Sequence, residues 1–85
     1  MSESYLLPTR VECYAGSRDD EVPRALWLDE ERLEIAEVED RWYQGSADPT
    51  LPAACYFRVR TTGGERHLLR LDLPTRAWYL VLPSS

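Results

Sequence analysis

The sequence contains no lysine and no asparagine, and it has only one histidine, one isoleucine and one phenylalanine among its 85 residues. No apolar run approaches the roughly 20 residues that a membrane-spanning helix needs, so we expect no membrane contact. The N-terminus lacks the basic start and the long apolar segment of a secretion signal. These absences predict a cytoplasmic protein. The length allows one domain, residues 1–85, and we expect its ordered core to span about residues 9–82.

Groups that carry catalytic or metal chemistry are scarce. Cys13 and Cys55 are far apart in the sequence, and in a reducing compartment we expect both to be free thiols. Together with His67 they lack the short paired spacing of zinc ligands, so we expect no metal site and no cofactor. The sequence also lacks a glycine-rich phosphate loop before a helix and a G-x-S-x-G motif. We therefore expect no catalytic residues and a non-enzymatic function.

Negative charge is concentrated in the first half of the chain. Residues 1–42 carry five arginines and twelve acidic residues, a net charge of −7, whereas residues 43–85 carry five arginines and three acidic residues, a net charge of +2. The sum is the formal net charge of −5. Nucleic-acid binding requires a positive surface, so this balance argues against a general nucleic-acid binder but leaves room for a local basic face.

The stretch RLEIAEVEDRW, residues 32–42, fits two secondary structures. A helix at about residues 29–43 is supported by a capping Asp29 and by early acidic residues. Its apolar stripe at helical spacing consists of Leu28, Ile35, Val38 and Trp42. However, Leu33 and Ala36 fall off that stripe.

A strand with one extra residue fits the same stretch better. Leu33 and Ile35 alternate, and the pattern then slips by one position. It continues on even positions at Val38, Asp40 and Trp42. One extra residue near Ala36 repairs the alternation, which is the signature of a β-bulge. We favour the bulged strand, preceded by a turn in WLDEERL.

The remaining segments indicate further strands. Alternating or strand-length runs occur at residues 10–16, 23–28, 55–61, 66–72 and 76–82, and a loop rich in turn formers lies at 45–53. With the bulged strand these runs predict an all-β domain of about six antiparallel strands, in a bent meander or a small SH3-like barrel. The alternative is an α+β domain with the helix at 29–43.

Alternation also predicts the register of the C-terminal hairpins. The apolar sides of residues 55–60 and 66–71 meet only if Phe57 lies opposite Leu69, because a shift of one residue would move every side chain to the other face. This requires an odd loop, Thr62–Gly64, with a glycine in the left-handed conformation. A loop at residues 73–76 then sets Leu71 opposite Trp78 and Leu69 opposite Leu80.

The predicted register gathers the candidate binding residues on the outer face of the sheet. They are Arg58, Arg60, Arg66 and Arg70, with Tyr56 and Tyr79 beside them. Arginine binds carboxylates and phosphates bidentately, so we expect an acidic protein partner or, second, single-stranded nucleic acid. The alternative is a ladder of ion pairs that only sets the register, with Glu37 and Glu39 beside Arg58 and Arg60, and with Arg66 and Arg70 left unpaired.

The aromatic residues are expected to divide between the core and the surface. Trp42 and Trp78 are expected to point into the core, which turns Tyr43 and Tyr79 outward. An exposed aromatic strip of this kind can stack on bases or hold a proline-rich peptide.

The order of these features resembles a family of short, uncharacterised bacterial cytoplasmic proteins, and more distantly a small domain found beside bacterial mutagenic DNA-repair genes. The resemblance covers residues 11–82. It is carried by Pro23 before a strand, DRW at 40–42, YFRVR at 56–60, a glycine turn and the closing Trp78. It implies the all-β fold but transfers no activity and no site residue; the gene neighbourhood hints at tolerance of DNA damage.

Two other functions stay open on the sequence. One is a structural accessory subunit or a homodimer, formed when an exposed strand edge pairs with another chain. The other is a small phosphate-ester enzyme that uses His67 and the adjacent arginines.

Overall fold

The computed structural model describes residues 4–14, 22–45 and 53–83. Within these ranges it contains seven β-strands and no helix. The strands are β1 (Ser4–Pro8), β2 (Val11–Cys13), β3 (Pro23–Leu28), β4 (Glu31–Gln44), β5 (Ala54–Thr61), β6 (Arg66–Asp72) and β7 (Trp78–Pro83). The predicted all-β class is confirmed, and the alternative helix at 29–43 is wrong because this segment forms a turn followed by β4. The loop predicted at 45–53 lies mostly outside the described residues.

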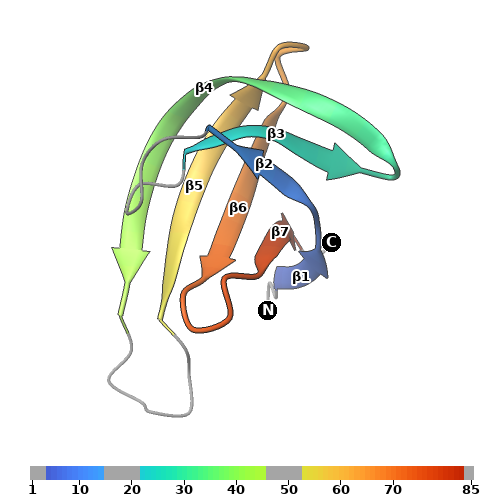
Figure 1. Cartoon of the computed structure of the whole chain (residues 1–85). Coiled ribbons are helices and arrows are strands. Elements are labelled where there is room, and N and C mark those ends of the chain that lie inside the picture. The colour runs from blue at the N-terminus through green and yellow to red at the C-terminus, as the bar shows by residue number, and fades with distance from the viewer. Residues whose placement is uncertain (1–3, 15–21, 46–52, 84–85) are drawn as a thin grey trace.

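All seven strands belong to one antiparallel sheet, in the order β1-β7-β6-β5-β4-β3-β2. From β2 to β7 each strand pairs with the next one along the chain, which is the predicted meander. The sheet curls into a half-barrel (Figure 1). The seventh strand, β1, was not expected from the sequence and pairs with β7. Because only Thr9 and Arg10 separate β1 from β2, the chain passes from one edge of the sheet to the other within two residues.

The long strand β4 contains the predicted bulge near Ala36. Ile35 pairs with Thr61 and Glu37 pairs with Arg60, so Ala36 is an extra residue that has no partner in β5. A bulge bends its strand and increases the local twist, and Figure 1 shows β4 curving over the top of the sheet. The extra residue keeps Ile35 on the core side and places Glu37 on the opposite side.

The two C-terminal hairpins have the predicted registers. Phe57 lies opposite Leu69, and the β5–β6 connection is the three-residue loop Thr62–Gly64. Gly64 takes the expected left-handed conformation, with a φ of 90°. The second hairpin is confirmed as well, with Leu71 opposite Trp78 and Leu69 opposite Leu80.

One contiguous core fills the concave side of the sheet. Its buried members are Leu26, Ile35, Phe57, Val59, Leu69, Leu71 and Leu80. Full burial of such a side chain stabilises the fold by about 1.5–3 kcal/mol, so the core accounts for most of the favourable free energy of folding. The Trp78 ring packs against Phe57, with 5.4 Å between ring centroids, so Trp78 points inward as predicted. We call this side of the sheet the core face and the opposite side the outer face.

The β3–β4 connection is a tight turn made by two acidic residues. Leu28 pairs directly with Glu31, which leaves only Asp29 and Glu30 in the turn. Both residues have positive φ angles, 51° and 67°. This conformation matches the type I′ turn that favours the right-handed twist of a hairpin, but it normally takes Asn or Asp followed by Gly. Glu30 therefore adopts a backbone conformation that costs an ordinary residue about 1 kcal/mol.

The left-handed glycine of the β5–β6 loop leads to a stability prediction. Gly64→Ala should lower the free energy of unfolding by about 1 kcal/mol, because a Cβ disfavours positive φ. The loss comes from the backbone alone, since no described atom beyond its chain neighbours lies within 4 Å of the position of a Cβ. Gly63→Ala is the matched control and should change the free energy by less than about 0.5 kcal/mol. Urea denaturation measures both, and equal losses would contradict the assigned loop conformation.

The acidic turn gives a prediction of opposite sign. The double substitution Asp29→Asn with Glu30→Gly should raise the free energy of unfolding by up to about 1 kcal/mol, because Asn-Gly suits a type I′ turn. Thermal denaturation at neutral pH measures the effect. A destabilised variant would show that the two carboxylates hold the turn through interactions stronger than the backbone strain.

Candidate functional site

The outer face carries two rows of side chains that run across the sheet from β4 to β1. The first, the Arg58 row, consists of Asp40, Arg58, Leu68, Val81 and Leu6. The second, the Tyr56 row, consists of Trp42, Tyr56, Arg70, Tyr79 and Pro8. Side chains directly opposite each other on adjacent strands are close enough to interact. The register therefore places all six predicted site residues on one face, with Arg60 and Arg66 forming a further pair beside the Arg58 row.

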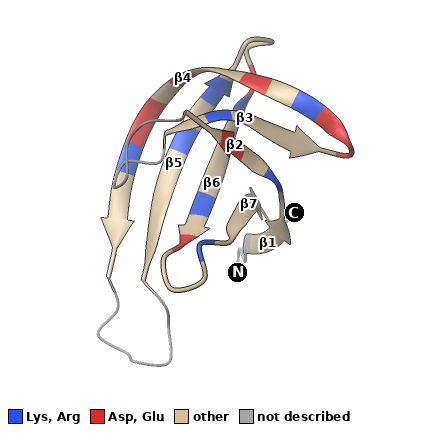
Figure 2. Ribbon diagram, viewed as in Figure 1, with Lys and Arg blue, Asp and Glu red and all other residues tan. Residues whose placement is uncertain are grey.

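Carboxylates of β4 neutralise two of the four arginines. Figure 2 shows acidic segments of β4 beside basic segments of β5. Arg60 Nη2 lies 2.9 Å from Glu37 Oε2, and Arg66 Nε donates a hydrogen bond of 2.8 Å to Glu39 Oε1. The bond to Glu39 and its charge raise the pKa of Arg66 above its ordinary value, so this guanidinium stays charged and engaged. The expectation that Arg66 is unpaired is wrong. Because these pairs are exposed, each contributes only about 0–1 kcal/mol.

Arg70 is also engaged, contrary to the prediction. Its Nη1 lies 3.6 Å from Asp72 Oδ1, and the two side chains are only 11% and 8% exposed. Asp72 is held in turn by Thr75, whose backbone N–H and hydroxyl both donate hydrogen bonds to Oδ2. The guanidinium also lies over the Tyr79 ring, 5.9 Å from its centroid. Arg70 is therefore a buried structural group between β6 and the β6–β7 loop.

Among the four predicted arginines, Arg58 has no carboxylate partner in the described part of the chain. It is exposed, and no carboxylate of the described residues lies within 4 Å of its guanidinium. Its cross-strand neighbour Asp40 instead accepts a hydrogen bond of 2.8 Å from the backbone N–H of Arg41. The guanidinium lies over the ring of Trp42, 5.7 Å from the centroid. Arg58 is therefore an exposed guanidinium whose charge no described carboxylate balances.

A second bulge, which the sequence analysis missed, brings Trp42 to the same place. Val38 pairs with Val59 and Asp40 pairs with Arg58, so Glu39 is an additional extra residue. It reverses the phase of the rest of β4, and Trp42 stacks on Tyr56 with 5.4 Å between centroids and 10° between planes. The prediction that Trp42 points into the core is wrong.

A signal for the second bulge was present in the sequence. The predicted phase placed Asp40 on the core face, where an unpaired carboxylate would be costly. The bulge turns Asp40 outward and places Arg41 above the Phe57 ring, 5.4 Å from its centroid. The same reversal places Tyr43 opposite Cys55 and so on the core face, and the prediction that Tyr43 points outward is wrong, although 64% of its surface is accessible.

The groups considered for catalysis do not converge. His67 lies on the core face opposite Val59, and its Nε2 is 3.4 Å from Glu65 Oε2. Arg66 and Arg70 project from the outer face of the same strand, so the sheet separates them from His67. Cys13 and Cys55 are half-buried and are not joined in a disulfide.

The described residues hold no cluster of three or more His, Cys, Asp or Glu side chains that is suited to a metal ion. Within the same ranges no helix has the length and apolar character required to span a membrane. Comparisons of the chain with protein-family models, curated proteins and solved structures found no match. The resemblance to bacterial proteins and to the repair-associated domain therefore stays a prediction, and the argument for function depends on the geometry of the outer face.

The stability that Asp72 provides should depend on pH. The hydrogen bond from Thr75 lowers the pKa of Asp72, and this outweighs the opposing effect of burial. Because the pKa of Asp72 is lower in the folded state, the stability that its carboxylate contributes is fully present above the unfolded-state pKa of about 3.9. This stability is lost as pH falls through the folded-state pKa of Asp72. Asp72→Asn should therefore lower Tm at neutral pH and differ less from the parent chain near about pH 2.

Thermal denaturation across this pH range tests the role of Asp72. Thr75→Ala removes the donor hydroxyl. Its loss of Tm relative to the parent chain should therefore also be larger at neutral pH than at low pH, although smaller than the loss in Asp72→Asn. If Asp72→Asn lowers Tm relative to the parent chain by the same amount at both ends of the pH range, the proposed role of Asp72 is contradicted.

Proposed function

We propose that this chain is a non-enzymatic interaction module whose outer face binds an acidic segment of a protein partner. The observation that supports this most directly is Arg58, an exposed guanidinium without a carboxylate among the described residues, set on the stacked pair of Trp42 and Tyr56. An unpaired guanidinium can take a carboxylate bidentately, with five donors in a fixed plane.

The surroundings of Arg58 suit a protein segment. Tryptophan, tyrosine and arginine are the side chains that most often dominate binding energy at protein interfaces. On the other side of Arg58, the same row continues with half-buried Leu68 and Val81 and ends at Leu6, which is 46% exposed. A partner segment that places a carboxylate on Arg58 can therefore place a neighbouring apolar side chain on Leu68 and Val81.

A protein partner fits the charges better than nucleic acid does. Binding to a phosphate backbone gains affinity from several cations that each release counterions. Three of the four outer-face arginines are already engaged by carboxylates, and the chain carries a net charge of −5. A single exposed guanidinium is sufficient for one carboxylate but provides little for a polyanion. Cys13 and Cys55 are not joined in a disulfide, which suits a reducing compartment, so we propose that the interaction takes place in the cytoplasm.

Pairing of the β1 edge with a second chain is a weaker candidate. It is favoured by the exposed apolar side chains of Tyr5, Leu6 and Leu7 on this edge strand. However, Thr9 N–H points to Trp78 of β7, and hydrogen bonding alternates along an antiparallel strand. Pro8 therefore faces the open edge, where it offers no N–H to a further strand, and proline at such a position is a common protection of edges.

The proposal is tested with a fluorescein-labelled peptide of alternating leucine and glutamate, followed by fluorescence anisotropy. Arg58→Glu should weaken binding by at least about tenfold, because it removes the cation and adds a repulsive charge. Arg10→Glu is the matched control, since Arg10 is also exposed and lies over a tryptophan ring, Trp27. Equal losses in the two variants would indicate general electrostatic attraction, and unchanged binding by Arg58→Glu would exclude the outer face as the site.

A further inference from the structure

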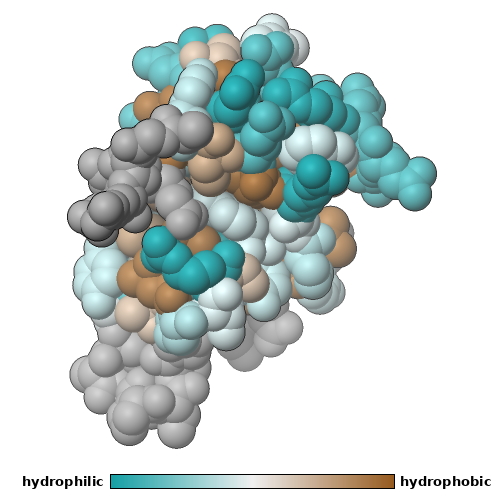
Figure 3. All heavy atoms as spheres, viewed as in Figure 1, coloured by the Kyte–Doolittle hydropathy of each residue, from teal (hydrophilic) through white to brown (hydrophobic). Residues whose placement is uncertain are grey.

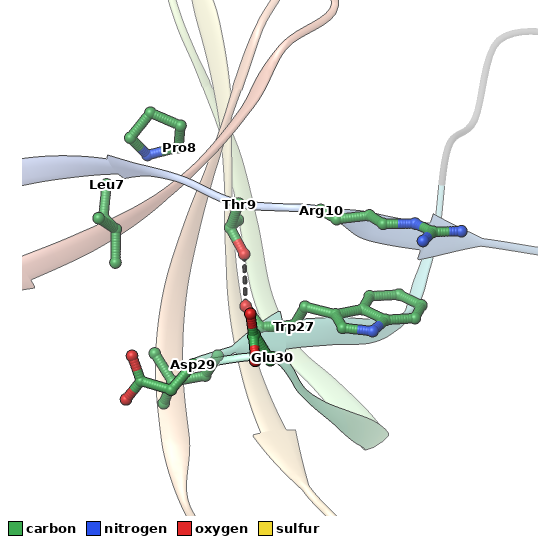
Figure 4. A pocket seen from close by; sticks show the side chains of 8 residues that line it. Leu7, Pro8, Thr9, Arg10, Trp27, Asp29 and Glu30 are labelled. Atoms are coloured by element: carbon green, nitrogen blue, oxygen red, sulfur yellow. Dashed lines mark hydrogen bonds between the residues drawn. The ribbon is translucent and has the colours of Figure 1, made fainter.

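The passage of the N-terminal segment between the two sheet edges leaves an open seam. At Thr9 and Arg10 the segment forms backbone hydrogen bonds to both edge strands. Thr9 N–H donates to Trp78 O of β7 at 3.1 Å, and Trp27 N–H of β3 donates to Arg10 O at 3.0 Å. The Thr9 hydroxyl also donates a hydrogen bond of 2.6 Å to Trp27 O (Figure 4). Toward β1 the chain diverges from the end of β3, and a groove of about 400 Å³ opens there.

The walls of this groove are mainly apolar and come from two segments far apart in the sequence. One wall is formed by Leu7 and Pro8 of β1, and the other by Leu28 with the Asp29–Glu30 turn. Leu7 is 42% exposed although it is apolar. An apolar surface of this kind is favourable to cover with the aliphatic part of a side chain.

Toward β1 and the β3–β4 turn the polar groups of the groove are acceptors, whereas Thr9 and Arg10 line its other end. Backbone groups of Pro8 face the open edge, and because proline has no N–H, the edge offers only its carbonyl at this position. The rim carries the exposed carboxylates of Asp29 and Glu30, followed by Glu31. Among the described residues no arginine or histidine lies within ion-pair distance of these three carboxylates.

One cation, Arg10, also lines the groove. Arg10 lies over the Trp27 ring at 4.6 Å, and in Figure 4 its side chain runs along the indole on the opposite side of Thr9 from Leu7 and Asp29. Figure 2 shows the acidic end of the β3–β4 hairpin projecting beyond the sheet, and Figure 3 shows hydrophilic side chains gathered over the same projection. Negative charge is therefore concentrated beside an apolar groove.

We infer that this seam groove binds a basic, partly apolar segment of a protein partner. An arginine or lysine side chain supplies the donors that the Pro8 carbonyl and the carboxylates of Asp29 and Glu30 lack, and its aliphatic stem covers Leu7 and Leu28. Addition of a further β-strand is disfavoured by the missing N–H of Pro8. The site is independent of Arg58, and the two surfaces select segments of opposite charge.

The experiment uses a fluorescein-labelled peptide of alternating leucine and arginine and the Asp29→Asn/Glu30→Gly variant of the full chain. This variant keeps the turn and should be more stable than the parent protein, so weaker binding cannot be attributed to unfolding. Binding measured by anisotropy should weaken by roughly tenfold, because two of the rim charges are removed. The indole N–H signal of Trp27 should shift on binding, whereas that of the core residue Trp78 should not.

A control variant must lose the same amount of negative charge away from the groove, so that a general electrostatic effect on peptide binding is recognised. Glu34→Gln with Glu65→Gln removes two carboxylate charges elsewhere on the chain and should bind the peptide as the parent protein does. Equal weakening in both double variants, or no binding by the parent protein, would overturn the inference. The leucine–glutamate peptide should be insensitive to Asp29→Asn/Glu30→Gly, so a failure at the seam groove is distinguished from a failure at Arg58.

Discussion

The phase of side chains along β4 determines what the outer face presents. Two extra residues, Ala36 and Glu39, interrupt the pairing of β4 with β5. The first allows Ile35 to remain in the core while Glu37 reaches Arg60. The second turns Trp42 outward onto Tyr56. Because side chains alternate strictly along a strand, each bulge reverses every later position, and two bulges in one strand decide which charges and rings become neighbours.

The N-terminal segment provides the second constraint on the molecule. It pairs with β7 on one side and then with β3 on the other, which joins the edges of a sheet that would otherwise remain open. A fully closed barrel has no edges, but here the junction is limited to a few residues around Thr9. Pro8 prevents the ladder from extending further along β1. The result is a curled sheet with a stable core and one seam, and the seam is the place where apolar side chains and unpaired acceptors remain exposed together.

Charge in this protein is mostly compensated locally. Glu37 and Glu39 neutralise Arg60 and Arg66, and Glu12 lies 3.7 Å and 3.1 Å from two further arginines on β3 and β4. Exposed pairs of this kind add little stability, and their better-supported effect is to disfavour wrong registers. Against this background, Arg58 on the outer face and the Asp29–Glu31 turn at the seam lack an oppositely charged partner among the described residues.

The sequence by itself determined the all-β class, the first bulge and the register of both C-terminal hairpins. These follow from alternation and from the parity of short loops, which are properties of neighbouring residues along the chain. The sequence did not reveal β1, whose run of Tyr5, Leu6 and Leu7 does not alternate, or the second bulge, which was visible only as the unfavourable inward position of Asp40. Tertiary structure decided which arginine remains uncompensated, because ion pairing depends on distances between strands. Glu39 pairs with Arg66, and Asp72, held by its turn, pairs with Arg70, so Arg58 is the one of these arginines without a carboxylate partner among the described residues.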